Sequence, residues 1–325
     1  RCSRDWSSDV CSSDLGRALH GAAHRSERTS RPAGRTRLRS TPRRLIMSEQ
    51  AVVPGEVVTL SPFVRRITAP NPGMMTGPGT NAYIVGTSSL ALIDPGPEIE
   101  SHRDLILKTV GDRLRWILCT HTHRDHSPGA AALKQSTGAE VIGMPAPPYD
   151  NQDTAFAPDR VFKHGDVLDC GDFTLRAVHT PGHASNHLCY LFEREKLLFT
   201  GDHVMQGSTV VISPPDGDMV AYLKSLESLV ALDITLIAPG HGRPIENPHA
   251  EAQRLVAHRL QREKKVVDAF AVKNPATLDE LVPVVYSDVS PKLHGVARRS
   301  LHAHLLKLVH DGRVKQEGDN WKLAR

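Results

Sequence analysis

The sequence predicts an α/β protein with many short strands, followed by a small C-terminal module of two helices and a β-hairpin. Eight short runs are rich in β-branched, aliphatic and aromatic residues. Stretches with apolar residues at three- and four-residue spacing lie between several of these runs. A chain of 325 residues is long enough for one large domain and a smaller one.

The predicted strands come in a regular order along the chain. They are NAYIVG (81–86), LALID (90–94), RWILCT (115–120), AEVIGM (139–144), FTLRAVHT (173–180), HLCYLF (187–192), KLLFTG (196–201) and ITLIAPG (234–240). The predicted helices between them are DLILKTVGD (104–112), SPGAAALKQSTG (127–138) and DMVAYLKSLESLVALD (218–233). We therefore expect one main domain over residues 47–248.

The residue pattern changes near residue 248. A long charged helix over 249–274 connects the main domain to a C-terminal section, 275–325. In that section, 277–286 and 295–312 have helical patterns, and 313–323 is typical of a hairpin that turns at Gly318, Asp319 and Asn320. Helix, helix and hairpin is the order of a winged-helix-like domain.

The first 46 residues do not share the pattern of the rest. DWSSDVCSSDL, from Asp5 to Leu15, looks like the translation of a sequencing adapter, and the segment that follows is Arg-rich, Ser-rich and poor in acidic residues. Such a composition is typical of an organelle transit peptide and also of translated upstream DNA. Because Met47 looks like a natural start, we expect 1–46 to be a non-native or disordered extension.

Charge and cysteine usage narrow the function classes. Residues 1–46 hold 11 Lys and Arg against 4 Asp and Glu, whereas the remainder holds 29 basic and 32 acidic residues. The main part of the chain therefore has no general basic field for nucleic acid. Cys119, Cys170 and Cys189 are widely spaced in apolar contexts, which favours buried thiols and a cytoplasmic protein. No apolar run approaches the ~20 residues that cross a membrane.

Polar residues follow the predicted strands at five points. Asp94 ends LALID, and HTHRDH (121–126) follows WILCT directly. His183, Asp202 and His241 each come within a few residues of a later strand. If these strands run in the same direction within packed sheets, all five groups meet at one rim.

The spacing within HTHRDH favours metal binding. His121 and His123 are two residues apart on extended chain and project to the same side, while Asp125 and His126 lie beyond the turn and can reach a second ion. Imidazole and carboxylate are ligands of zinc. So many polar groups cannot be buried together without a cation.

These motifs together resemble the metallo-β-lactamase superfamily, whose HxHxDH motif stands here as HTHRDH, with TPGH, TGDH and APGHG after it. The resemblance covers 47–248 and implies a four-layer αββα sandwich as the catalytic domain. It implies one zinc ion held by His121, His123 and His183, and a second held by Asp125, His126 and His241. It further implies that Asp202 bridges both ions and that Asp94 orients a ligand from behind.

The resemblance also implies a mechanism. Two zinc ions would activate a shared water as a hydroxide that attacks a carbonyl carbon or phosphorus, so that no nucleophilic side chain is needed. Asp125, Asp202 and His203 are the candidate catalytic residues. For His203, donation to the substrate or leaving group and simple packing both remain open.

Several branches of the superfamily fit poorly. β-Lactamases of the commonest class have cysteine at the position of Asp202, and diiron flavoproteins have an acidic residue at the position of His123. Glyoxalase II thioesterases share all seven ligands but end in a different helical domain. Persulfide dioxygenases bind one iron with a subset of these ligands, so iron or manganese stays open.

With its terminal winged helix, the chain from Met47 to Arg325 is similar to the lactamase-β-like-2 family, whose characterised branch cleaves single-stranded RNA. The basic residues that could bind phosphate are Arg298, Arg299, Lys307, Arg313 and Lys315. Three hypotheses follow: a zinc endoribonuclease, a hydrolase of small thioesters, lactones or esters, and a nucleic-acid or protein binding module on a metal-domain scaffold. A homodimer also remains open.

Overall fold

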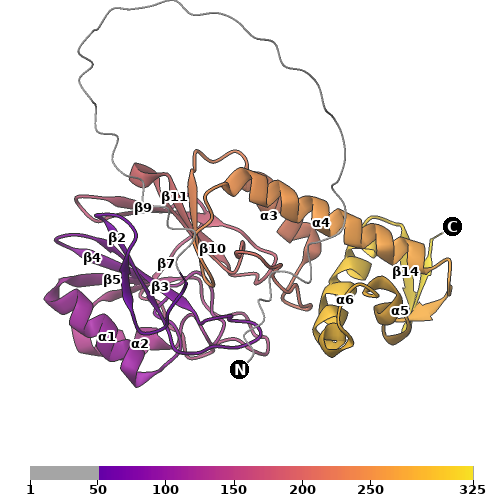
Figure 1. Ribbon diagram of the computed structural model, residues 1–325, viewed down its shortest axis with the longest axis horizontal. Coiled ribbons are helices and arrows are strands. Elements are labelled where there is room, and N and C mark those ends of the chain that lie inside the picture. Colours follow the sequence, from indigo (N-terminus) through magenta and orange to yellow (C-terminus); the bar gives the residue numbers. More distant parts are fainter. Residues whose placement is uncertain (1–50, 325) are drawn as a thin grey trace, which may run out of the picture. The chain divides into compact units, whose positions relative to one another are not determined.

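The computed structural model describes residues 51–324, so the extension expected over 1–46 lies outside the described residues. Two β-sheets face one another with helices on their outer faces, and a third, small sheet belongs to the C-terminal section (Figure 1). The chain passes once through the first sheet and then through the second before it enters the C-terminal helices.

The first sheet has seven strands, in spatial order β1 to β7. The bounds are β1 (Val57–Thr59), β2 (Val64–Thr68), β3 (Asn81–Gly86), β4 (Leu90–Ile93), β5 (Leu114–Leu118), β6 (Glu140–Gly143) and β7 (Arg160–Val161). Strands β1 to β4 pair antiparallel, whereas β4 to β7 pair parallel.

The second sheet has five strands, in spatial order β12, β11, β10, β9 and β8. The bounds are β8 (Val167–Asp169), β9 (Thr174–His179), β10 (Leu188–Phe192), β11 (Leu197–Gly201) and β12 (Leu236–Pro239). Because β9 and β11 both pair antiparallel with β10, and β11 is parallel to β12, the strands β9, β11 and β12 share one direction.

Alternation along the strands builds the layers. In β10, Tyr190 and Phe192 point into the core between the sheets, while Cys189 and Leu191 point to the outer face. That outer face packs against α3 (Met219–Leu229) and α4 (Pro248–Ala269), and the outer face of the first sheet packs against α1 (Glu100–Val110) and α2 (Gly129–Thr137). The predicted four-layer αββα sandwich is therefore confirmed.

All eight strands expected from the sequence are present, with ends within two residues of the predicted ones. Five further strands were not predicted from the sequence: β1, β2, β7, β8 and β13 (Ala276–Thr277), of which all but β2 have three residues or fewer. The three cysteines expected to be small buried thiols are free and buried.

The C-terminal section has the expected order. It contains β13, α5 (Leu278–Val285), α6 (His294–His310), β14 (Val314–Glu317) and β15 (Asn320–Leu323). Thr277 begins α5 with a capping box that it forms with Glu280. The three strands form a sheet with β15 in the middle, which confirms the winged-helix domain. The boundaries expected at residues 248 and 274 stay predictions.

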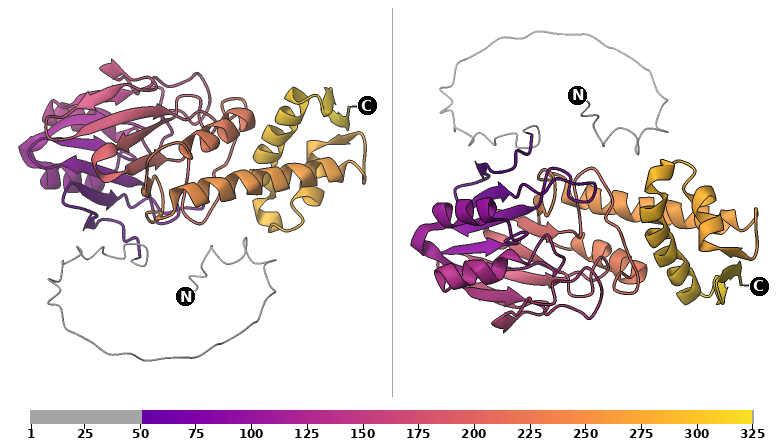
Figure 2. Two further views of the ribbon diagram at one scale, coloured as in Figure 1. Left: turned by 90° about the horizontal axis from the view of Figure 1, so that it is seen from above. Right: turned by 90° about the horizontal axis from the view of Figure 1, so that it is seen from below.

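The long helix α4 is continuous over 22 residues (Figure 2). Short 3-10 turns occur at Gly111–Arg113, Glu193–Glu195 and Pro291–Leu293. Between residues 51 and 324, no helix is both long and apolar enough to cross a membrane.

Trp321 tests whether the hairpin completes the C-terminal core. Its side chain is 1% exposed and packs with residues of α5 and α6. Trp321→Ala should lower the free energy of unfolding by about 3–5 kcal/mol, because a large buried side chain leaves a cavity. Chemical denaturation measures this change. Val272→Ala, at a site 74% exposed, is the control, and equal midpoints for both variants would contradict the packing described.

Candidate metal centre

The HTHRDH segment forms a tight loop at the end of β5. The amide of His126 donates to the carbonyl of His123 at 2.9 Å, which closes the turn, and the amide of Gly96 donates to the carbonyl of His126. The chain is thereby fixed on both sides of Asp125. His121 and His126 are fully buried or nearly so, whereas the side chain of Asp125 is 28% exposed.

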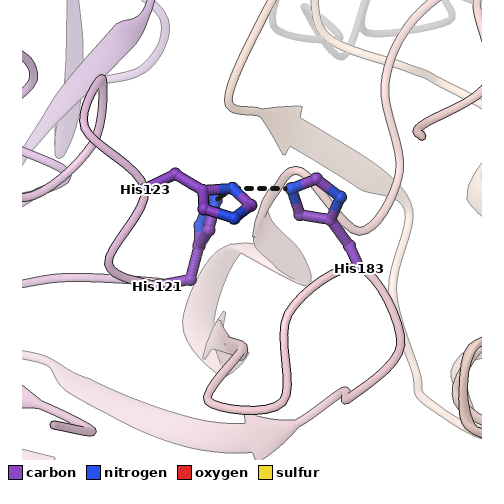
Figure 3. A group of neighbouring side chains, drawn as sticks. All are labelled: His121, His123 and His183. Atoms are coloured by element: carbon purple, nitrogen blue, oxygen red, sulfur yellow. Dashed lines mark hydrogen bonds between the residues drawn. The ribbon is translucent and has the colours of Figure 1, made fainter. Parts of the chain in front are cut away.

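Three imidazoles form the first group of ligand atoms. Nδ1 of His123 lies 3.0 Å from Nε2 of His121 and 3.0 Å from Nε2 of His183. Figure 3 shows the three rings turned toward one another, with His183 arriving from a separate loop. One imidazole proton cannot serve both short contacts of Nδ1. A tetrahedral zinc ion, with bonds of about 2.0–2.1 Å, sets its ligands roughly 3.3 Å apart, so the group fits such an ion.

The second group contains Asp125, His126 and His241, whose ligand atoms lie within 4.8 Å of one another. Nε2 of His241 is 3.3 Å from Oδ2 of Asp125, and Nε2 of His126 is 3.5 Å from the same oxygen. This group combines two imidazoles with a carboxylate, which is also a donor set that zinc accepts.

Asp202 lies between the two groups. Its Oδ2 is 3.6 Å from Nε2 of His183, and its Oδ1 is 3.4 Å from Nε2 of His126 and 3.2 Å from Nε2 of His241. One oxygen therefore faces each group. Oδ1 is buried without a hydrogen-bond donor among the described residues, as expected of an atom that receives a cation.

The remaining ring nitrogens have partners that orient the imidazoles. Nδ1 of His183 donates to the carbonyl of Val211 at 2.8 Å, and Nδ1 of His241 to the carbonyl of Gly79 at 3.1 Å. Nδ1 of His121 lies 3.0 Å from the hydroxyl of Thr120. We infer that the proton of each of these three rings sits on Nδ1, which leaves the Nε2 lone pair for a metal.

Asp94 supports the loop from behind. Its Oδ1 accepts the amide of Thr120 at 2.7 Å, and its Oδ2 accepts the Thr120 hydroxyl at 2.8 Å. Oδ2 also lies 2.9 Å from Nδ1 of His126. Asp94 has a φ of 52°, an unfavourable conformation for a residue with a side chain, and its three contacts hold it there.

The charges around the cluster also fit a cation. Burial, reinforced by His183, lowers the pKa of His123 to about 3, so this ring stays neutral. Burial alone would lower the pKa of His241 as well, yet Asp202 and Asp125 raise it to about 10. The carboxylates thus attract positive charge, which a proton or a divalent ion can supply.

Gly240, in the APGHG motif, leaves room for the cluster. A Cβ at this position would lie 2.8 Å from Oδ1 of Asp202 and 2.8 Å from Cε1 of His126. Any larger residue would have to displace the central carboxylate. The glycine therefore serves close approach of the chain to the ligands.

The structure brings together all seven residues that the sequence indicated as ligands, and it adds partners that were not predicted from the sequence. Thr120 links Asp94 to His121, and the hydroxyl of Thr80 donates to Oδ2 of Asp125 at 3.2 Å. A threonine directly before the HTHRDH motif was a visible signal for Thr120. The carbonyls of Val211 and Gly79 have no side-chain signal at all.

His203 lies deep in the structure. It is 0% exposed, burial lowers its pKa to about 3, and its ring centroid lies 5.3 Å from that of Tyr222. This environment favours the packing alternative, while a catalytic role stays a prediction. His187 is buried too, with Nδ1 2.9 Å from the Thr180 hydroxyl.

The basic residues considered for phosphate binding are partly neutralised. Arg298 pairs with Asp279, Lys307 pairs with Glu263 and Asp311, and Arg313 pairs with Glu263. The Lys307 side chain is only 14% exposed. Three of the five candidates therefore already have acidic partners.

Comparison with known proteins identifies the family. Residues 75–241 match the model of the metallo-beta-lactamase superfamily, which is about half of the chain. The chain belongs to this superfamily. Residues 277–321 match the beta-lactamase associated winged helix domain, in agreement with the C-terminal fold.

Relatives of this superfamily member include enzymes with named activities. It is 32% identical to atrochrysone carboxyl ACP thioesterase AgnL7 of Paecilomyces divaricatus, over 80% of this chain and 83% of that protein. It is 31% identical to the beta-lactamase-like protein 2 homolog of Drosophila melanogaster, over 82% of this chain and 94% of that protein. It spans 59% of the length of another relative, the lactamase-like protein nscB of Arthroderma benhamiae.

A solved structure shows the same fold. A beta-lactamase domain protein from Burkholderia ambifaria superposes with a TM-score of 0.72 and 22% identity, covering 85% of this chain and 96% of that one. The superfamily, the fold and the cluster together make this chain a metallo-β-lactamase-fold hydrolase.

Asp202 offers the most direct test of the cluster. Asp202→Ala removes the carboxylate whose two oxygens face the two ligand groups, so the variant should bind at least one zinc ion fewer than the parent. Elemental analysis after dialysis against zinc measures the ratio of metal to protein. Asp233→Ala, which changes a carboxylate 80% exposed on the surface, should keep the parental ratio, and two ions in Asp202→Ala would contradict the bridging position.

Asp94→Asn tests the support behind the ligands. An asparagine can still accept the amide of Thr120, but its NH₂ group cannot accept the proton on Nδ1 of His126. Metal affinity should fall by about 10- to 100-fold, as is usual when a partner of a ligand is lost. Competition with a chromogenic chelator measures the affinity. An unchanged affinity would show that His126 does not depend on Asp94.

Proposed function

We propose that the chain is a two-metal hydrolase, with zinc as the metal, that cleaves acyl thioesters. Asp202, placed between two groups of three ligands, is the observation that carries the two-metal hydrolase. His121, His123 and His183 would hold one ion, and Asp125, His126 and His241 the other. Bound zinc would polarise the carbonyl under attack and make a water nucleophilic near neutral pH.

The residues of the chain orient and shield this chemistry. The carbonyls of Val211 and Gly79, together with Asp94, fix the directions of three imidazoles. His121 and His126 lie on the buried side, whereas Asp125 is 28% exposed. Substrate therefore approaches from the side of Asp125, where its carbonyl oxygen and the attacked carbon can reach the cluster.

A cysteine nucleophile is not supported by its surroundings. Among the described residues the three cysteines are buried, and burial raises the pKa of Cys189 to about 12. Such a thiol forms almost no thiolate at neutral pH. Hydrolysis without a covalent acyl-enzyme intermediate is thus the simpler proposal.

Two features favour a thioester over RNA. Similar proteins from Paecilomyces divaricatus and Aspergillus fumigatus are named atrochrysone carboxyl ACP thioesterases. In addition, Arg298, Lys307 and Arg313 form ion pairs within the chain, which leaves less free positive charge for a phosphate backbone.

Cleavage of single-stranded RNA is the second candidate function. It is favoured by the resemblance to the lactamase-β-like-2 family and by the winged-helix domain over residues 277–321. A two-metal site also suits phosphodiester cleavage, because both the attacking and the leaving oxygen can be stabilised. Arg299 and Lys315, for which no ion pair is found between residues 51 and 324, would be its first phosphate contacts.

A cytoplasmic location and a homodimer, both expected from the sequence, stay predictions.

One assay separates the two candidates. The zinc-loaded full chain is incubated with an acyl thioester of N-acetylcysteamine, with thiol release followed by absorbance, and in parallel with end-labelled unstructured RNA. We expect thiol release that falls at least about 10³-fold in Asp202→Ala, since metal activation contributes several kcal/mol.

The outcome decides between the substrates. The variant Asp233→Ala should behave like the parent on the thioester. Cleavage of RNA without thiol release would replace the first proposal by the second. Activity on neither substrate, with two zinc ions bound, would contradict both proposed functions.

A further inference from the structure

Arg259 is a buried charge in the middle of α4. The side chain belongs to a residue only 3% exposed. Its neighbours on the helix have acidic or basic partners: Arg262 pairs with Asp288, and Glu263 pairs with Lys307. For Arg259, no carboxylate partner is found within residues 51–324. Burying a guanidinium group without a counter-charge is costly, so the contacts that it does make indicate its role.

The first contact leads to a metal-ligand candidate. Nη2 of Arg259 donates to the carbonyl of Val210. The next carbonyl, that of Val211, accepts from Nδ1 of His183 at 2.8 Å. Val210 and Ile212 are 3% and 0% exposed, so the segment is held between α4 and the cluster. Arg259 thus fixes one side of a segment whose other side orients His183.

The second contact leads to the central carboxylate. Cζ of Arg259 lies 5.3 Å from the ring centroid of Tyr222 on α3. The Tyr222 hydroxyl donates at 3.1 Å to the carbonyl of His203, the residue after Asp202. Helices α3 and α4 lie next to each other in Figure 1, in agreement with their shared core cluster.

The same tyrosine also contacts the loop before His183. A Cβ on Gly182 would lie 2.4 Å from Cα of Tyr222, and Gly182 has a φ of 142°. Only glycine lets the loop come this close to α3. Tyr222 therefore touches the residue before His183 and the residue after Asp202.

We propose that Arg259 is a positioning residue of the metal centre, which acts on His183 through Val210–Val211 and on Asp202 through Tyr222. It contacts neither ion nor substrate. The inference rests on the metal centre of the proposed function but not on the identity of the substrate. Through Arg259, the helix α4, which leads into the winged-helix domain, would help to position the metal ligands.

Metal affinity of the full chain tests this role. Arg259→Gln should weaken the binding of one of two zinc ions by about tenfold, at the lower end of the effect of losing a ligand partner. Arg259→Lys keeps the charge and one donor and should recover most of that loss. Chelator competition gives the affinities, and the d–d absorption of cobalt-substituted protein reports the coordination around the weakened ion.

Arg262→Gln is the matched control, because Arg262 lies three residues further along α4 and is 7% exposed. Its contacts go to Asp288 and to the carbonyl of Val285 in the winged-helix domain. This variant should lose stability but keep both zinc affinities. If Arg259→Gln does not fold, Arg259→Lys against Arg262→Lys makes the same comparison, with a loss expected only in the former.

The outcomes separate this inference from the proposed function. Parental zinc affinities in Arg259→Gln, or equal losses in both arginine variants, would overturn the positioning role while leaving thioester hydrolysis intact. Weaker zinc binding in Arg259→Gln, in a chain whose parent binds two ions but cleaves no thioester, would support the role and overturn the function. A parent that binds no divalent ion would overturn both.

Discussion

The rest of the structure depends on one electrostatic constraint: seven imidazole and carboxylate side chains meet at one place, four of them buried and three partly exposed, and this arrangement requires positive charge among them. The pKa values of Asp125 and Asp202 lie below the ordinary value for aspartate, because the attraction of neighbouring imidazoles outweighs the effect of burial. The fold satisfies this constraint by directing strands of both sheets to one rim. Two backbone positions at this rim are unusual: Asp94 has a positive φ, and Gly240 lies so close to the ligands that a Cβ would not fit.

The cluster is rigid on one side and accessible on the other. Every imidazole in it except that of His123 has its second nitrogen tied to a carbonyl, hydroxyl or carboxylate. Of those fixed rings, His121, His126 and His241 are buried, whereas His183 is partly exposed, as are His123 and Asp125. An arrangement of this kind holds ions from behind and leaves the front for a reacting group, which hydrolysis by a metal-activated water requires.

The sequence predicted most of this site because metal ligands are side chains with a recognisable chemistry. The eight strands with strong apolar patterns were foreseen for a similar reason, since each is largely buried. Four of the five unforeseen strands have only two or three residues, and Val57, Val161 and Val167 in them are more than 40% exposed. Too few residues alternate there for a periodic signal.

The roles of Arg259 and of the other basic residues could not be read from the sequence for a different reason. In the charged stretch HRLQREKK an arginine is most simply a solvated residue, and only tertiary packing shows that Arg259 is buried. Likewise, Lys307 and Arg313 look free in the sequence, yet both pair with Glu263 on α4. The sequence of a helix shows which charged residues it carries. It does not show which of them form ion pairs, because the partners lie on elements that are far apart in the chain.

The same contacts bear on what a winged-helix domain does in this chain. Ala303 of α6 packs in the core cluster that contains Tyr222 and Leu226 of α3, so one face of α6 is occupied by the metal domain rather than by a nucleic acid. Glu263 of α4 forms ion pairs with Lys307 of α6 and with Arg313, which follows α6 in the chain. These pairs occupy two of the five basic residues considered for phosphate binding. The winged-helix domain therefore packs on α3 through α6 and pairs with α4 through Glu263.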